Sequence, residues 1–222
     1  MSTITPKNIC RLCLILLLLI AVLPVCTQET FVISEQVLQG AERRYGPGAR
    51  QRLIAWQNLL ENEKKSSEKE KLEKVNRFFN KIPYVDDMTQ WGVDDYWATP
   101  VEFLASNGGD CEDYAIAKYF SLIALGIDED KLTLTYVKAL RLNEAHMVLT
   151  YYPSPKAEPL ILDNLISAIK PASQRTDLLP VYSFNGSGLW LAKQRERGKQ
   201  VGSSSRLKRW QEMLDRMNKE FQ

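Results

Sequence analysis

The residues with the clearest capacity for chemistry are a cysteine, a histidine and an aspartate, in that order along the chain. Cys111 is the only cysteine outside the N-terminal leader, and it follows the pair Gly108-Gly109 where a helix is expected to begin. His146 is the only histidine, and Asp163 lies downstream of it. A thiol, an imidazole and a carboxylate in this order indicate nucleophilic acyl chemistry.

Each of the three residues has a defined task in such a reaction. A cysteine attacks a carbonyl as thiolate, which a helix N-terminus or a neighbouring histidine favours. We expect His146 on a strand over 145–152 and Asp163 at the end of the next strand. A paired register would set the carboxylate beside the imidazole and fix its tautomer. The glycines would let the backbone approach a substrate, and the Cys111 amide would donate to an oxyanion.

Taken singly, the three residues have plain structural explanations. Cys111 could be a small buried apolar residue and His146 a core histidine bonded to a backbone carbonyl. Asp163 could be a turn residue, since Asp163-Asn164 ends a strand. The joint pattern outweighs these explanations, because the only cysteine of the exported body lies on a glycine-led helix start. A catalytic triad is therefore the favoured interpretation.

An acidic segment surrounds the predicted nucleophile. No lysine or arginine lies between Lys81 and Lys118, but eight acids do: Asp86, Asp87, Asp94, Asp95, Glu102, Asp110, Glu112 and Asp113. Carboxylates near a thiol oppose the thiolate, so a cation should offset them. Calcium suits carboxylates and backbone carbonyls, whereas one cysteine and one histidine cannot furnish a tetrahedral zinc site. A solvated acidic loop is the alternative, since EF-hand spacing is absent.

The periodicity of apolar residues predicts the elements that would position these groups. Helices are expected over 34–64 with a break at Gly46-Pro47-Gly48, then from Ser67, from Thr99 and from Cys111 to 125. Residues 83–92 read as an irregular loop. Strands are expected over 132–140, 145–152, 160–163, 178–184 and 188–193, and a C-terminal helix over about 204–221. Helices first and an antiparallel sheet afterwards predict an α+β domain.

The N-terminus reads as an export signal. Lys7 and Arg11 form a positively charged region before an apolar run, 12–25, that has the length of a signal-peptide core and is short for a spanning helix. Residues 1–27 are therefore interpreted as a signal peptide or N-terminal anchor, and 28–222 as a single domain. Cleavage near Thr27 is favoured over lipidation at Cys26 and over an uncleaved anchor. The exported body has one cysteine and forms no internal disulfide.

The length and net charge of the chain limit the classes of function that it can have. A chain of 222 residues with 45% hydrophobic residues can bury one sizeable core. Lys and Arg number 29 and Asp and Glu 27, and the leader removes two of the basic residues, so the mature chain has 27 of each sign. A nearly neutral chain is a poor candidate for nucleic-acid binding by broad phosphate neutralisation.

Two blocks of sequence resemble a known family. They are Asp95-Tyr96-Trp97-Ala98-Thr99-Pro100-Val101-Glu102-Phe103 and Gly108-Gly109-Asp110-Cys111-Glu112-Asp113-Tyr114-Ala115. Both are similar to the bacterial transglutaminase-like cysteine proteinases of the LapG type, and the resemblance runs from about residue 31 to about 193. It implies a papain-like or transglutaminase-like cysteine proteinase fold, with N-terminal helices packed on an antiparallel sheet, and a triad of Cys111, His146 and Asp163.

The resemblance also implies a function. Proteins of this family are periplasmic, calcium-dependent endopeptidases that cut the N-terminal region of a large surface adhesin and so release cells from a biofilm. An inner-membrane LapD-type receptor that responds to cyclic di-GMP holds them inactive. By motif match, the calcium ligands are expected among Asp94, Asp95, Asp110, Glu112 and Asp113, with the backbone carbonyls of Trp97 and Tyr114. A monomer is expected.

Two alternatives stay open. The same triad supports acyl transfer to an amine, which differs from proteolysis only in whether water or an amine resolves the acyl-enzyme. A non-catalytic binding module of the same fold is the third reading, and an intact triad argues against it.

Overall fold

Helices come first along the chain and strands follow, in a computed structural model that describes residues 31–191 and 198–220. The helices are α1 (Glu35–Tyr45), α2 (Pro47–Glu63), α3 (Glu68–Phe79), α4 (Asp87–Trp91), α5 (Pro100–Ser106) and α6 (Cys111–Ala124), and α7 (Lys208–Glu220) comes last. The strands are β1 (Leu132–Ala139), β2 (Glu144–Tyr151), β3 (Leu160–Leu162), β4 (Lys170–Pro171), β5 (Leu178–Phe184), β6 (Leu189–Leu191) and β7 (Gln200–Gly202). The predicted α+β class is confirmed.

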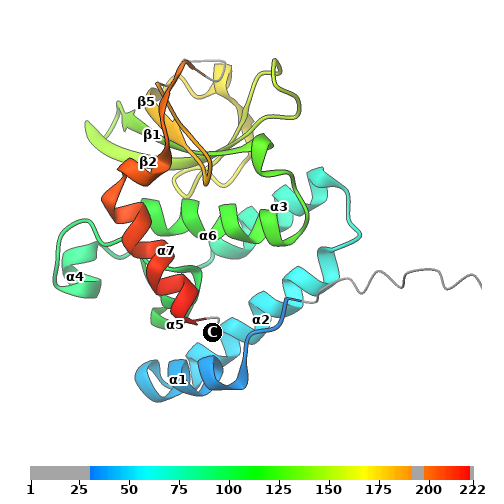
Figure 1. Ribbon diagram of the computed structural model, residues 1–222, viewed down its shortest axis with the longest axis vertical. Coiled ribbons are helices and arrows are strands. Elements are labelled where there is room, and N and C mark those ends of the chain that lie inside the picture. The colour runs from blue at the N-terminus through cyan, green and yellow to red at the C-terminus, as the bar shows by residue number, and fades with distance from the viewer. Residues whose placement is uncertain (1–30, 192–197, 221–222) are drawn as a thin grey trace, which may run out of the picture.

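One antiparallel sheet carries all of these strands, in the order β4-β3-β2-β1-β5-β6-β7. Figure 1 shows α6 lying across one face of this sheet, with α1, α2 and α5 farther from it. The main core includes Leu122 of α6 with Leu134 and Leu149 of the sheet, and it continues among the helices through Leu53 and Phe79. A smaller apolar cluster, which includes Val148 and Ile161, lies apart from this core. N-terminal helices thus pack on an antiparallel sheet, as expected.

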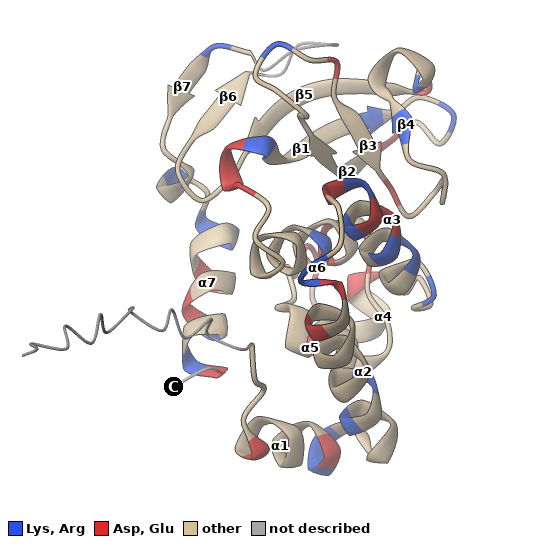
Figure 2. Cartoon of the chain, turned by 90° about the vertical axis from the view of Figure 1, so that its right-hand side faces the viewer, with Lys and Arg blue, Asp and Glu red and all other residues tan. Residues whose placement is uncertain are grey.

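Local signals explain where the helices begin. The Ser67 hydroxyl accepts from the Glu70 amide while the Glu70 carboxylate accepts from the Ser67 amide, a capping box that starts α3. An equivalent box between Thr99 and Glu102 starts α5. Gly46, with φ 85°, separates α1 from α2 in a conformation that glycine adopts without strain. Figure 2 shows both signs of charge mingled along α3, as on a solvated helix face.

Two predicted boundaries need correction. The segment over 83–92 is not wholly irregular, because it contains α4, whose first turn is capped by Asp86 accepting from the Thr89 amide at 2.9 Å. The last helix begins at Lys208 rather than 204, since Ser204–Arg206 form a 3-10 turn and Leu207 is extended. The α4 boundary is set by the polar cap of Asp86, and the α7 boundary by the extended backbone of Leu207. The predicted leader lies outside the described residues.

The last helix is fastened to the segment that precedes α5. Arg216 of α7 donates to the carbonyl of Trp97 and pairs with Glu102 at 3.3 Å. Glu220 accepts from the Thr99 hydroxyl at 2.7 Å, and Arg209 pairs with Asp95. Among residues 31–191 and 198–220, no helix has both the length and the apolar character needed to cross a membrane.

Candidate active site

Cys111 is the first residue of α6, at the helix N-terminus predicted for it. The Asp113 carboxylate accepts from the Asp110 amide at 3.2 Å and so caps this helix start. The first amides of a helix have no partner within it and carry partial positive charge, so a group facing them is stabilised when negative. The thiol is partly exposed, as a nucleophile must be.

His146 and Asp163 lie together, as the sequence predicts. His146 is near the beginning of β2, and Asp163 follows β3 directly. The imidazole Nε2 is 2.8 Å from Oδ1 of Asp163, and both side chains are buried. A carboxylate can only accept, so Nε2 carries the hydrogen and Nδ1 is left free to accept a proton.

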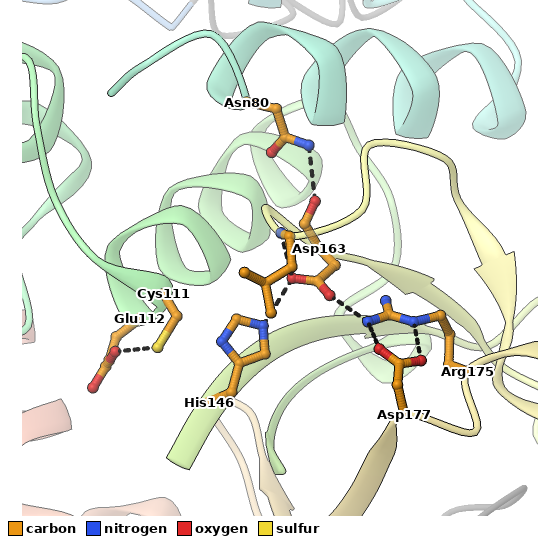
Figure 3. A network of polar contacts seen from close by, with 8 residues as sticks. Asn80, Cys111, Glu112, His146, Asp163, Arg175 and Asp177 are labelled. Atoms are coloured by element: carbon orange, nitrogen blue, oxygen red, sulfur yellow. Dashed lines mark hydrogen bonds and ion pairs between the residues drawn. The ribbon is translucent and has the colours of Figure 1, made fainter. Parts of the chain in front are cut away.

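Cys111 and His146 line one open pocket. Its other lining residues are Tyr84, Leu142, Glu144, Ala145, Asn164 and Leu165. Figure 3 shows the thiol and the imidazole on facing sides, with Asp163 behind the ring. The Met147 amide also donates toward the thiol sulfur. The structure therefore brings all three predicted catalytic residues to one place, although the thiol does not bond the imidazole directly.

The thiol proton is directed at a carboxylate instead. Sγ of Cys111 donates to Oε2 of Glu112 at 2.7 Å. Burial, followed by the charges of Glu112 and Asp110, holds the pKa of the Cys111 thiol well above its usual range. The Met147 amide acts in the opposite direction. Without a positive charge near these carboxylates, the nucleophile is a neutral thiol.

Asp163 is held as a carboxylate by several donors. Burial by itself raises the pKa of Asp163, but hydrogen bonds from His146, from the Leu165 amide and from Arg175 outweigh it and bring the pKa to about 2. Oδ1 accepts from the Leu165 amide at 3.0 Å and Oδ2 from Arg175 at 2.7 Å. Asn80 donates to the Asp163 carbonyl at 2.8 Å. The carboxylate is thus ionised and fixed in direction.

A second group of acids forms a candidate cation site beside the helix start. One carboxylate oxygen from each of Asp87, Asp110 and Asp113 lies within 4.8 Å of the others. Within the described part of the chain, Oδ1 of Asp87 and Oδ1 of Asp110 are buried without a hydrogen-bond partner. Burial raises the pKa of Asp87 to about 6 and also raises those of Asp110 and Asp113. Buried, unpartnered carboxylate oxygens close together fit a hard cation.

The other predicted ligands are not part of the cluster of Asp87, Asp110 and Asp113. Asp94 is exposed, and Asp95 pairs with Arg209 and accepts from the Trp97 indole at 2.9 Å. The Trp97 carbonyl accepts from Arg216, and Tyr114 lies within α6, where backbone carbonyls accept helical hydrogen bonds. Glu112 contacts the thiol and groups with Cys111 and Asp110. The sequence reasoning missed Asp87, although its place in the acidic segment was a usable signal.

The glycines before Cys111 serve the protein's own packing. A Cβ on Gly109 would lie 2.3 Å from an Asp113 carboxylate oxygen and 2.7 Å from the Phe103 ring. A Cβ on Gly108 would lie 2.8 Å from Val85. Gly109 therefore has to be glycine for the helix-capping carboxylate to reach its place. Close approach to a substrate, the reason expected from sequence, stays a prediction.

Lys118, two turns along α6 from the thiol, is a buried cation. Its side chain is fully buried, and Nζ has no hydrogen-bond partner among the described residues. Burial lowers the pKa of Lys118 to about 7 from 10.5, against the opposing effect of Asp163. The unfolded chain therefore binds more protons between these pH values, and the free energy of unfolding rises as pH rises from about 7 to about 10.5.

Replacing Lys118 with methionine should stabilise the protein at pH 7 by roughly 2 to 4 kcal/mol, since the substitution removes the desolvation of an ammonium group. The gain should shrink toward pH 10, where the folded protein already holds a neutral amine. Urea unfolding at both pH values measures it. Lys74→Met, at a half-exposed ion pair with Glu63, is the control and should show no such pH-dependent gain. Equal gains at pH 7 and pH 10 would contradict the assignment.

Comparisons with known proteins place these features in context. A family model described as bacterial transglutaminase-like cysteine proteinase matches residues 55–192. A solved structure of Legionella pneumophila LapG is 48% identical over 85% of this chain and 99% of that chain, with a TM-score of 0.72. An EGTA-treated form of LapG from the same organism is 48% identical over 85% of this chain and 100% of that chain, with a TM-score of 0.74. A calcium-bound form is 50% identical over 83% of this chain and 99% of that chain, with a TM-score of 0.71. No curated protein matches the chain.

Proposed function

The chain belongs to the bacterial transglutaminase-like cysteine proteinases, and we propose that it is a calcium-dependent endopeptidase that cuts a large cell-surface adhesin near its N-terminus. The family resemblance of the segment around Cys111 is thereby confirmed, and the α+β fold is that of a transglutaminase-like cysteine protease. The observation that carries the proposed chemistry is the 2.8 Å contact between His146 and Asp163, because the imidazole also lines the pocket that Cys111 lines.

The triad accounts for peptide hydrolysis in two steps. The S–H group of Cys111 rotates away from Glu112 and transfers its proton to Nδ1 of His146. The resulting thiolate attacks the peptide carbonyl carbon. The helix-start amide of Cys111 donates to the developing oxyanion. The tetrahedral intermediate collapses to a thioester as His146 returns the proton to the leaving amine. Water then attacks the thioester, losing its proton to His146, and the thiol leaves with that proton as the carboxylic product forms.

Asp163 acts on the imidazole throughout. Its carboxylate accepts from Nε2, which keeps Nδ1 as the basic nitrogen and stabilises the imidazolium that forms in each step. The pKa of about 2 means that Asp163 stays ionised over the whole range in which such an enzyme works. The proton therefore shuttles between Cys111, the leaving group and His146, without moving to Asp163.

Calcium is proposed to bind at Asp87, Asp110 and Asp113, whose two unpartnered oxygens fit a hard cation. The bound ion would supply positive charge next to the helix start, offsetting the carboxylates that disfavour a thiolate at Cys111. The solved LapG structures include a calcium-bound and an EGTA-treated form, which supports the choice of calcium. Asp110, one residue before the nucleophile, would link the ion to the active centre.

The biological setting is part of the proposal. The leader read over residues 1–27 supports export to the periplasm, with the protein either released or anchored. There the protease would cut its adhesin and release cells from a biofilm. An inner-membrane receptor that responds to cyclic di-GMP would bind the protease and keep it inactive. These assignments rest on membership of the family and on the leader, and cell fractionation checks the compartment.

Cleavage of the adhesin is the direct test. The mature protein, incubated in calcium with the N-terminal region of a large adhesin from the same genome, should yield two fragments with one new N-terminus. Blocking the thiol with iodoacetamide should prevent this. Intact adhesin after incubation with folded, calcium-loaded protein would overturn the assigned substrate. If a labelled amine became covalently attached to the adhesin and no new N-terminus appeared, the protein would be assigned as an acyl transferase and not as a hydrolase.

A further inference from the structure

We propose that Arg175, clamped by Asp177, is a positioning residue that sets the direction of the Asp163 carboxylate and thereby the tautomer of His146. The inference rests on the proposed triad and adds two residues, Arg175 and Asp177, that support it from behind Asp163. Neither residue belongs to the conspicuous sequence blocks around the thiol. Both lie in the segment between β4 and β5, and Figure 3 shows them on the side of Asp163 that faces away from His146.

The contacts form a continuous chain from His146 to Asp177. Nη2 of Arg175 donates to Oδ2 of Asp163 at 2.7 Å and to Oδ2 of Asp177 at 2.8 Å. Nε of Arg175 donates to Oδ1 of Asp177 at 3.0 Å, so the Asp177 carboxylate binds two N–H groups along one edge of the guanidinium. The Leu140 amide donates to the Asp177 carbonyl at 2.8 Å, which ties this residue to the end of β1.

Burial makes the network rigid. The side chains of Arg175 and Asp163 are 1% and 0% exposed. Asp163 uses one oxygen for His146 and the Leu165 amide and the other for Arg175, so a rotation of its carboxylate would break contacts on both sides. Water cannot replace these donors in a buried site without leaving charges unpaired. The direction of Asp163 is therefore decided from the far side, by Arg175.

The planar fork of arginine suits this task. A guanidinium grips one carboxylate through two N–H groups and still directs a further N–H at a second carboxylate, with all donors in one plane. A lysine supplies the charge but only a point contact, which holds neither carboxylate in a fixed direction. Arg175→Lys should thus keep the charge balance of the site while loosening Asp163.

The experiment reads the tautomer of His146 directly. Because His146 is the only histidine, its ring nitrogens give the only imidazole signals in a ¹⁵N NMR spectrum. In a Cys111→Ala background, the neutral ring should carry its proton on Nε2 alone. Adding Arg175→Lys should mix the two tautomers. In the enzyme with its thiol intact, the same substitution should lower kcat by about 10- to 100-fold, as loss of an outer-shell partner does elsewhere, with KM within about twofold.

Matched variants separate positioning from general support of the fold. Arg52 donates to the carbonyls of Leu104 and Ala105, and Arg52→Lys should leave the tautomer and kcat unchanged while lowering the melting temperature. Asp177→Asn keeps Arg175 but weakens its clamp, so an intermediate mixture is expected even if other Arg175 variants fold poorly. A folded Arg175→Lys protein with one tautomer and an unchanged kcat would overturn the inference. The tautomer is measured without substrate, so this outcome is independent of whether the adhesin is cut.

Discussion

Replacing Cys111 with alanine is expected to abolish adhesin cleavage, with a loss of kcat on the order of 10⁴ or more. In the proposed mechanism the thiol becomes covalently bound to the substrate, and the oxyanion donors and the binding surface cannot replace it. His146→Ala should cause a loss of similar size, because the imidazole both takes and returns the proton. The measurement is the rate at which the new N-terminus appears under saturating calcium.

Folding has to be preserved for this result to bear on the mechanism. Cys111 is partly exposed and small, so the alanine variant should melt within about a degree of the parent and should still bind the adhesin fragment. A double variant with His146→Ala should be no slower than either single one, since residues that act as a unit are not additive. Persistent cleavage by a folded Cys111→Ala protein would remove the triad from consideration.

Chelating calcium with EGTA should stop cleavage and lower the melting temperature. The carboxyl groups of Asp87, Asp110 and Asp113 lie close together, those of Asp87 and Asp113 buried, so ionising all three is unfavourable unless a cation binds among them. Free calcium at 100 times its dissociation constant would stabilise the fold by about 2.7 kcal/mol through mass action. Asp87→Asn should weaken calcium binding on the order of tenfold or more by removing one charged ligand. Thermal unfolding as a function of calcium concentration measures both effects.

The substitution at Asp87 has a signature that separates a ligand from a merely structural residue. In EGTA, Asp87→Asn should be at least as stable as the parent, because one of three repelling carboxylates is gone while the asparagine oxygen can still accept from Tyr96. In calcium it should be less stable. Asp94→Asn is the matched control, an exposed neighbour expected to change neither quantity. Equal calcium affinity in both variants would place the ion somewhere else.

Local signals made much of the fold predictable. Capping boxes at Ser67 and Thr99 lie within four residues of sequence, so the starts of α3 and α5 needed no tertiary information. The strand over 178–184 was predicted with the bounds of β5. The short α4 was missed because its five residues lack a full apolar period and depend on the side-chain cap from Asp86.

Some residues of the candidate site could also be predicted from the sequence, whereas others could be identified only in the folded structure. Cys111 and His146 could be found because each is the only residue of its type within residues 28–222, and Asp163 because it directly follows the next strand. Asp87 and Arg175 could not be selected from their neighbours, since the roles proposed for them depend on which carboxylates the folded chain brings near them. Asp94 and Asp95 illustrate the converse: they share the acidic segment with Asp87 but face solvent or Arg209.

The attachment of α7 to the segment before α5 has a consequence for the order in which activity can arise. Arg216 donates to Trp97 and Glu220 accepts from Thr99 across 119 and 121 residues of chain, so these contacts form only after α7 has been synthesised. A nascent chain that ends before α7 would therefore carry Cys111 and the acid cluster without this support. Deleting residues 208–220 should mimic that state and lower both the melting temperature and the activity.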